Sequence, residues 1–222
     1  MTNLRFTPYA WAKLIFMRDQ GSTEVAGYGV SSIEDPLLVT DFMLVKQESS
    51  AATFDFDDEG LADYVDDMID LDFQPAEFLR IWIHTHPGNS ASPSSTDETT
   101  FAEKFSDSDW AIMFILAKGG ETTTVLKYKQ PQCRINIPNS VDFNEEFGES
   151  RKEEWKEEYK LCVKEKTYKK KKGTSKKKKI ANKSNTFLFD DDDWEIDEEY
   201  GSEEDLVNLF TTSSLYNKGG LY

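Results

Sequence analysis

The residues best suited to chemistry in this chain are its two histidines, which stand one residue apart at His84 and His86. Side chains alternate between the two faces of a strand, so both imidazoles lie on one side if this segment is extended. Asp97 follows with ten residues between it and His86. Two imidazoles and a carboxylate occupy three corners of a tetrahedral Zn2+ site and leave the fourth for water, as in catalytic zinc sites.

The elements that must position these groups are a strand that ends in a turn and a helix that starts soon after it. The apolar run 81–83 and the turn signal Pro87-Gly88 indicate the strand end. Either Ser94 or Ser95 could cap a helix that carries Asp97 in its first turn. Each piece also has a plainer interpretation: a lone histidine is more often structural, and Ser94-x-x-Asp97 alone indicates only a helix cap. The conjunction of the pieces favours a metal site.

The pattern His84-x-His86-Pro87 followed by Ser94-x-x-Asp97 resembles the signature of the JAMM metalloproteases, also called MPN-plus or JAB domains. Glu24, in the context Glu-x-x-Gly, is similar to a glutamate that the family carries upstream. The resemblance covers roughly residues 1 to 140. It implies that His84, His86 and Asp97 bind Zn2+, and that the fold is a three-layer α/β/α, cytidine-deaminase-like JAMM fold with a mixed sheet.

The resemblance also implies catalytic roles for Glu24 and Ser94. Zinc lowers the pKa of its bound water toward about 7, so Glu24 would act as general base and then protonate the leaving amine. Ser94 would donate to the charge that develops on the carbonyl oxygen. The plainer interpretation of Glu24 is a solvated charge at a strand end. If the register of the strands were different, the general base could instead be Glu34, Glu48 or Glu59.

Hydrophobic periodicity in the first part of the chain predicts an α/β domain. Thr7-Pro8 should start a helix that ends near Gly21, and apolar residues at helical spacing predict another helix across 61–69. The acidic stretch 55–72 could line a cleft or form a solvated helix face. The remaining expectations are strands at 24–31, 37–46, 110–117, 122–128 and 133–137, and a helix at 98–105.

Charge divides the chain into segments, with a net charge of −16 over residues 1–150, +10 over 151–183 and −10 over 184–222. We therefore expect a catalytic domain at 1–143 and an amphipathic helix at 144–168. A Lys-rich linker at 169–185 should be disordered when free, and an acidic, aromatic segment occupies 186–222. The tract Lys169 to Lys179 could bind nucleic acid, bind an acidic partner, or only keep the chain soluble.

Two cysteines, the lack of an early apolar leader and the lack of 18 consecutive apolar residues favour a cytoplasmic protein in a reducing compartment, without membrane attachment. The expected activity is zinc-dependent hydrolysis of a peptide or isopeptide bond in a protein or peptide, including a ubiquitin-like modifier. About a dozen residues follow Asp97 before the next strand, which leaves little room for the extra loop of ubiquitin-chain-specific family members.

Three other functions can be weighed against this one. A non-catalytic JAMM-like scaffold would keep the fold and act through its charged tail. A metal-dependent phosphoesterase also uses His-x-His pairs, but it generally needs more ligands, and the chain has no further histidine. A zinc deaminase would need a Cys-x-x-Cys pair, which the sequence lacks.

Overall fold

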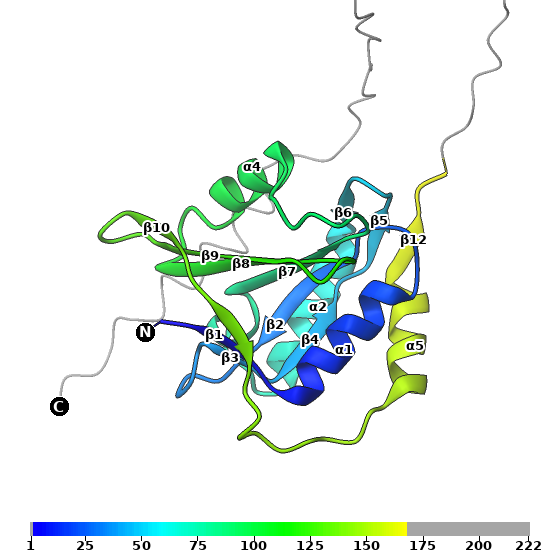
Figure 1. Ribbon diagram of the computed structural model, residues 1–222, viewed down its shortest axis with the longest axis horizontal. Helices are drawn as coiled ribbons and strands as arrows, with labels where there is room; N and C mark the ends of the chain where they lie inside the picture. The colour runs from blue at the N-terminus through cyan, green and yellow to red at the C-terminus, as the bar shows by residue number, and fades with distance from the viewer. Residues whose placement is uncertain (1, 168–222) are drawn as a thin grey trace, which may run out of the picture.

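A six-stranded mixed sheet lies at the centre of the computed structural model, which describes residues 2–167 (Figure 1). The strand order is β10-β9-β8-β7-β2-β4, in which β7 and β8 are parallel and the other neighbours are antiparallel. The strands are β2 (Ala26–Val30), β4 (Asp41–Leu44), β7 (Ile81–His86), β8 (Trp110–Ala117), β9 (Thr122–Tyr128) and β10 (Cys133–Asn136).

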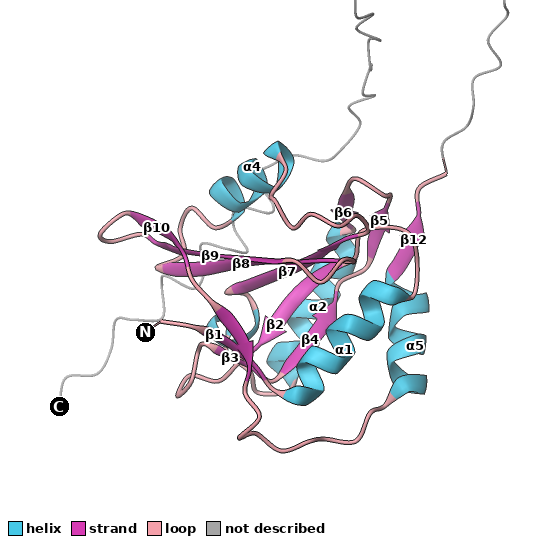
Figure 2. Cartoon of the chain, viewed as in Figure 1, coloured by secondary structure: helices cyan, strands magenta, loops and turns pink. Residues whose placement is uncertain are grey.

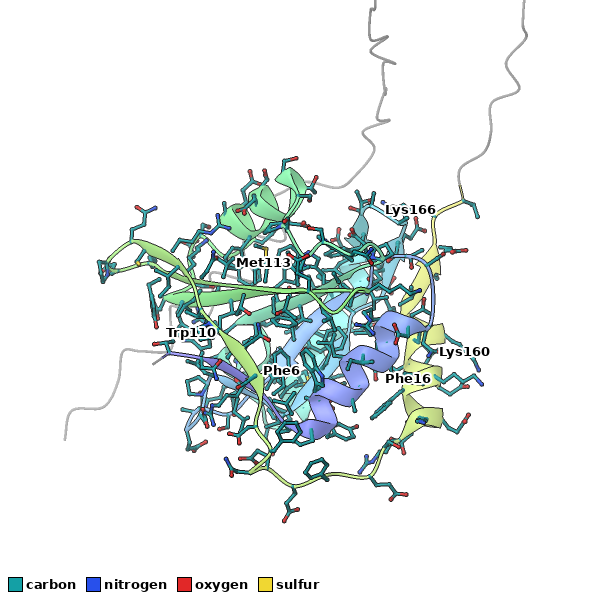
Figure 3. The ribbon with its side chains drawn as sticks, in the orientation of Figure 1. Phe6, Phe16, Trp110, Met113, Lys160 and Lys166 are labelled. Atoms are coloured by element: carbon teal, nitrogen blue, oxygen red, sulfur yellow. The ribbon has the colours of Figure 1, made fainter. Side chains whose placement is uncertain are left out.

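The period of two along β8 builds two separate cores, one on each face of the sheet. Ile112 and Phe114 belong to the first core, whereas Met113 and Ile115 belong to the second. Figure 3 shows Met113 on the side of the sheet that faces α4, and Phe6 on the opposite side. Because both faces are covered, β8 is apolar along nearly its whole length.

Helices cover both faces of the sheet (Figure 2). The first core is covered by α1 (Pro8–Asp19) and α5 (Lys152–Cys162), which contribute Leu14 and Trp155. The second is covered by α2 (Asp58–Asp70), α3 (Pro75–Phe78) and α4 (Ser95–Lys104), which contribute residues such as Leu61 and Phe101. The predicted three-layer α/β/α architecture with a mixed sheet is confirmed.

Local signals account for most helix and strand bounds. Thr7 caps α1 through its hydroxyl, with Pro8 at the first helical position, as predicted. Strands β8 and β9 have the predicted bounds. The predicted strand at 37–46 is divided: β3 (Leu38–Val39) joins β1 (Leu4–Phe6) in a second sheet, and only β4 pairs with β2.

Two three-stranded sheets flank the central one. β1 lies between β3 and β11 (Asn139–Val141), and all three strands are parallel. The other sheet has the order β12-β5-β6, from β5 (Gln47–Ser49), β6 (Phe54–Phe56) and β12 (Val163–Glu165). The C-terminal strand of the described chain therefore adds to a hairpin that is formed more than a hundred residues earlier.

A buried ionic cluster fixes α5 against α1 and β4. The Nζ of Lys13, which is almost fully buried, lies 2.8 Å from Glu158 and 3.1 Å from Asp41. Glu158 also accepts a hydrogen bond from the Leu44 amide at 2.9 Å. Removing one partner of such a cluster would leave an uncompensated buried charge, so the register of α5 on the domain is well defined.

The prediction of a helix at 144–168 is wrong in its bounds, because the observed helix α5 covers only 152–162. Before it, Asp142 accepts hydrogen bonds from the Asn144 and Glu145 amides in a turn. After it, the backbone extends so that β12 can pair with β5. The predicted segments 169–185 and 186–222, with the tract Lys169 to Lys179, lie outside the described residues. None of the described helices is both long and apolar enough to cross a membrane.

Candidate metal centre

His84 and His86 lie on the same face of β7, as the strand period requires, and this is the face of the second core. His84 is fully buried, and its ring packs on Trp82 at 4.7 Å and on Phe54 of β6 at 5.6 Å between centroids. The His86 side chain is 12% exposed. One imidazole is therefore in the core, and the second lies at the C-terminal end of β7, where it is partly exposed.

Asp97 meets both imidazoles. His84 Nε2 lies 3.4 Å from Asp97 Oδ1, and His86 Nε2 lies 3.6 Å from Oδ2. One ligand atom from each residue lies within 4.8 Å of the others. For metal–ligand distances of about 2.1 Å, the edge of a tetrahedron is about 3.4 Å. The observed nitrogen–oxygen separations therefore suit three ligands of one small cation.

Three of the four imidazole nitrogens have no hydrogen-bond partner within the described part of the chain. His84 Nε2 and His86 Nε2 are buried and form no hydrogen bond there, and neither does His84 Nδ1. Buried polar atoms are rarely left unpaired, because desolvation without a partner is costly. The His86 Nδ1 lies 3.0 Å from the Ser90 carbonyl oxygen. A proton on Nδ1 satisfies that contact and leaves the Nε2 lone pair for a metal.

A capping box holds the Asp97 carboxylate in place. Asp97 Oδ2 accepts a hydrogen bond from the Ser94 amide at 2.7 Å, and the Ser94 hydroxyl accepts one from the Asp97 amide at 3.1 Å. Burial opposes ionisation of Asp97, but the two imidazoles and the Ser94 amide outweigh it and hold its pKa far below the usual range. Asp97 therefore stays ionised, as a cation ligand must.

The two imidazoles have pKa shifts of opposite sign. Burial lowers the pKa of His84, although Asp97 opposes this change. The contact with Asp97 raises the pKa of His86 against the effect of its burial. Neutral imidazole is the form that binds a metal, so burial favours the binding form of His84, whereas Asp97 favours the protonated form of His86 and makes its metal binding more dependent on pH.

Glu24 lies two residues before β2 and close enough to His86 and Asp97 to interact with both electrostatically. Its amide donates to the Ser50 carbonyl at 2.8 Å. The next residue, Val25, bonds to Thr85 twice, through the Thr85 hydroxyl at 3.1 Å and the Thr85 amide at 2.9 Å. These bonds place Glu24 alongside the end of β7, between the two histidine positions and the β5–β6 hairpin.

The environment of Glu24 suits a group that exchanges protons near neutral pH. The residue is 6% exposed, and burial raises the pKa of its carboxyl to about 7. The charge of His86 opposes this rise and that of Asp97 adds to it. A general base works best with a pKa near the operating pH. The predicted rivals, Glu34, Glu48 and Glu59, are all exposed.

Two roles are predicted for Ser94, a helix cap and an oxyanion donor. The structure confirms the cap, because the Ser94 hydroxyl oxygen caps α4. The cap uses the oxygen as an acceptor, and a serine hydroxyl keeps one proton to donate. Its role as an oxyanion donor stays a prediction. The structure thus brings together His84, His86, Asp97 and Glu24, with Ser94 held against Asp97.

Sequence reasoning missed the groups that support these residues. Phe54 contacts His84, and the Ser90 carbonyl orients His86. Gln47 is buried and bonds to both the amide and the carbonyl of Ala26, two residues after Glu24. The strand period indicates that Thr85 faces away from the histidines, but no local signal reveals that its hydroxyl accepts the Val25 amide.

Comparison with known proteins gives limited guidance. No protein-family model matches the sequence, and no curated protein matches it. The structure is similar to the solution structure of protein DSY2949 from Desulfitobacterium hafniense, with 16% identity, a TM-score of 0.47, and coverage of 62% of this chain and 92% of that one. It is also similar to the crystal structure of a JAB1/MPN domain protein from Archaeoglobus fulgidus, with 9% identity, a TM-score of 0.33, and coverage of 63% and 99%.

Both TM-scores are below 0.5 and both identities are below 25%. The chemistry of the site therefore has to be inferred from the chain's own residues, of which His84, His86 and Asp97 form a group that could hold a metal ion.

Proposed function

We propose that this chain is a zinc-dependent hydrolase of the JAMM type that cleaves a peptide or isopeptide bond. One observation carries the proposal. Two buried imidazole nitrogens, which form no hydrogen bond within residues 2–167, face one carboxylate, and a second buried carboxyl group near them has a pKa of about 7. A structural zinc site would need a fourth protein ligand, whereas three ligands with an adjacent base are typical of a hydrolytic site.

His84, His86 and Asp97 would hold the ion. Two imidazoles and a carboxylate are a common donor set for zinc. When bound, zinc lowers the pKa of a coordinated water toward about 7 and polarises the substrate carbonyl. Asp97 needs no deprotonation for this role, because its pKa is already low. The hydrogen bond from His86 to Ser90 keeps its ring oriented during turnover.

Glu24 would move the proton in both halves of the reaction. Its carboxylate accepts a proton from the attacking water as the oxygen adds to the carbonyl carbon. The same proton then passes to the leaving nitrogen as the carbon–nitrogen bond breaks, which yields an acid and an amine. The Ser94 hydroxyl would donate to the carbonyl oxygen, where negative charge develops. Glu24 returns to its starting state after each cycle.

The proposed substrate is a protein or peptide amide, including an isopeptide bond or a ubiquitin-like fusion, as the resemblance to the JAMM family implies. We also propose that the enzyme acts in the cytoplasm. The tract Lys169 to Lys179 remains a candidate for binding nucleic acid or an acidic partner.

The test is a substrate screen with a matched inactive variant. Zinc-loaded protein and its Glu24→Gln variant would be incubated with ubiquitin-like fusion proteins and with proteins extracted from the source cells, and new termini identified by mass spectrometry. We expect new termini that require zinc and that fall at least about 100-fold with Glu24→Gln, while zinc content is unchanged. Full zinc occupancy without any zinc-dependent terminus would favour the scaffold alternative.

A further inference from the structure

The turn that carries Glu24 is held on its outer side by the C-terminal elements of the described chain. A Cβ atom built on Gly21 would overlap the hydroxyl of Tyr159, which belongs to α5, and would lie 3.5 Å from its Cζ. Gly21 is thus in van der Waals contact with the end of the Tyr159 ring. The backbone of Gly21 is not left-handed, so a side chain added there would meet the Tyr159 hydroxyl and not an unfavourable backbone conformation.

Two further contacts join the same turn to the same elements. Thr23 is 6% exposed, and its hydroxyl forms no regular hydrogen bond with the described residues. It nevertheless lies close enough to Tyr159 to affect the phenol: burial raises the pKa of Tyr159, and Thr23 partly offsets that rise. The Ser22 hydroxyl lies 3.5 Å from Oε1 of Glu165 in β12. Consecutive residues before Glu24 therefore all meet α5 or β12.

These C-terminal elements are themselves firmly attached. Glu158, next to Tyr159, is bonded to Lys13 and to the Leu44 amide. β12 pairs with β5, and the Lys166 amide donates to the Ser49 carbonyl at 2.8 Å. The neighbouring Ser50 carbonyl accepts the Glu24 amide. Tyr159 therefore extends toward the turn from a helix that is anchored to the domain on both sides of this residue.

We propose that Tyr159 is a positioning residue for Glu24, acting through its contact with Gly21 and Thr23. The inference rests on the proposed function, in which Glu24 is the general base. A base has to be within about 2.6–3.2 Å of the proton that it accepts. A displacement of about 1 Å can cost about 100-fold in rate. The C-terminal helix, which forms no hydrogen bond or ion pair with the metal ligands among the described residues, would in this way govern the efficiency of the site.

Steric complementarity between Gly21 and Tyr159 permits a direct test. Gly21→Ala should push the turn and the Tyr159 ring apart, and Tyr159→Phe should make room for the added methyl group. We therefore expect Gly21→Ala to be impaired and Tyr159→Phe, which loses the contacting hydroxyl, to be mildly impaired. The Gly21→Ala/Tyr159→Phe double variant should recover, because the added methyl group fills the space of the hydroxyl. Tyr159→Ala should be impaired, and Leu161→Ala, an exposed change on the same helix, should not.

The probe is acetohydroxamate, a zinc-binding acid whose proton a neighbouring carboxylate can accept. We expect its dissociation constant for the zinc-loaded protein to rise at least about 10-fold in Gly21→Ala and Tyr159→Ala, and to stay within about 3-fold of wild type in the double variant. Zinc content should be equal throughout. Wild-type affinity in Gly21→Ala, or no recovery in the double variant, would overturn the proposal.

Hydrogen exchange of the Glu24 amide supplies a readout that needs neither metal nor activity. Exchange should accelerate in Gly21→Ala and return toward wild type in the double variant, with the amides of β8 unchanged. Glu24→Gln separates the two claims. If it binds acetohydroxamate like wild type, the base assignment of the proposed function fails, and the exchange data alone decide whether Tyr159 positions the turn. Unchanged exchange in Gly21→Ala would then refute that role.

Discussion

The metal-ligand half of the site is built on regular secondary structure, whereas the Glu24 half is built on a turn supported by distant segments. His84 and His86 are successive same-face residues of a central strand, and Asp97 is in the capped first turn of α4. Glu24 lies outside any strand or helix. Its position depends on Thr85, on the β5–β6 hairpin and on α5.

This difference suggests a division of labour. The ligands lie on a strand and a capped helix, and only local groups, such as the Ser90 carbonyl that orients His86, adjust their geometry. The base needs correct placement and a tuned pKa, and both come from burial and from contacts that the neighbouring segments provide. Changes in the ligand half should therefore abolish metal binding, and changes in the Glu24 half should leave the metal in place but reduce turnover.

The largest effect is expected from Asp97→Asn. The amide oxygen can still accept the Ser94 amide, so the α4 cap is kept, but the charged ligand is lost. We expect zinc affinity to fall by about 100-fold or more, measured by competition with a chromophoric chelator. Asp107→Asn is the matched control, because Asp107 is exposed and contacts only Lys129 among the residues for which bonds are described. Equal affinity in Asp97→Asn and wild type would place the metal elsewhere.

Thr85→Val tests the junction between the two halves. The variant keeps the shape of the side chain but leaves the buried Val25 amide without its acceptor, which should lower the free energy of unfolding by about 1–3 kcal/mol. Urea unfolding of the metal-free protein measures this change, and Thr85→Ser, which keeps the hydroxyl, should lose less. Zinc affinity should change little. A Thr85→Val variant as stable as wild type would show that this bond does not hold the Glu24 segment.

Ser94→Ala should have a smaller effect on stability, of about 1 kcal/mol, because it removes the side-chain cap of α4. The Asp97 carboxylate keeps its bond from the residue-94 amide, so zinc should still bind. Ser94→Thr is the control, since threonine also caps helices. If Ser94 donates to the reacting carbonyl, Ser94→Ala will lower turnover more than its small stability loss explains; equal kcat values would reduce Ser94 to a cap.

The last prediction concerns the pH dependence of stability in the metal-free protein. Burial raises the pKa of Glu24 from 4.5 to about 7, so the native state holds this proton more tightly than the unfolded state does. The contribution of Glu24 to stability is therefore fully present below about pH 4.5 and is lost as the pH rises through about 7. Glu24→Gln removes this contribution. Unfolding curves at pH 5 and pH 7.5 should show wild type losing more stability than the variant, and parallel changes would contradict the raised pKa.

The same contrast explains how much the sequence reveals. The spacing of His84, His86 and Asp97 predicts a shared face and a capped helix because strand and helix periods are local properties, and the structure has both. The apolar runs of β8 and β9 likewise predict their bounds. These features depend on neighbours within a few residues, which a single sequence contains.

The supports of Glu24 could not be predicted, because they join segments far apart in the chain. Tyr159 reaches Gly21 only because Glu158 binds Lys13 and because the chain after Cys162 extends to pair with β5. A helical pattern through 144–168 hides that strand. Burial of Glu24, and hence its raised pKa, also depends on the tertiary arrangement and not on its neighbours in sequence.

X-ray absorption spectroscopy at the zinc edge of the zinc-loaded full chain tests the central claim most directly. The account predicts a four-coordinate ion with two imidazole nitrogens and two oxygen donors at about 2.0–2.1 Å, from His84, His86, Asp97 and one water. His84→Ala should lose the bound zinc. A shell that contains sulfur from Cys133 or Cys162, or a spectrum without imidazole scattering, would contradict the assignment of this site.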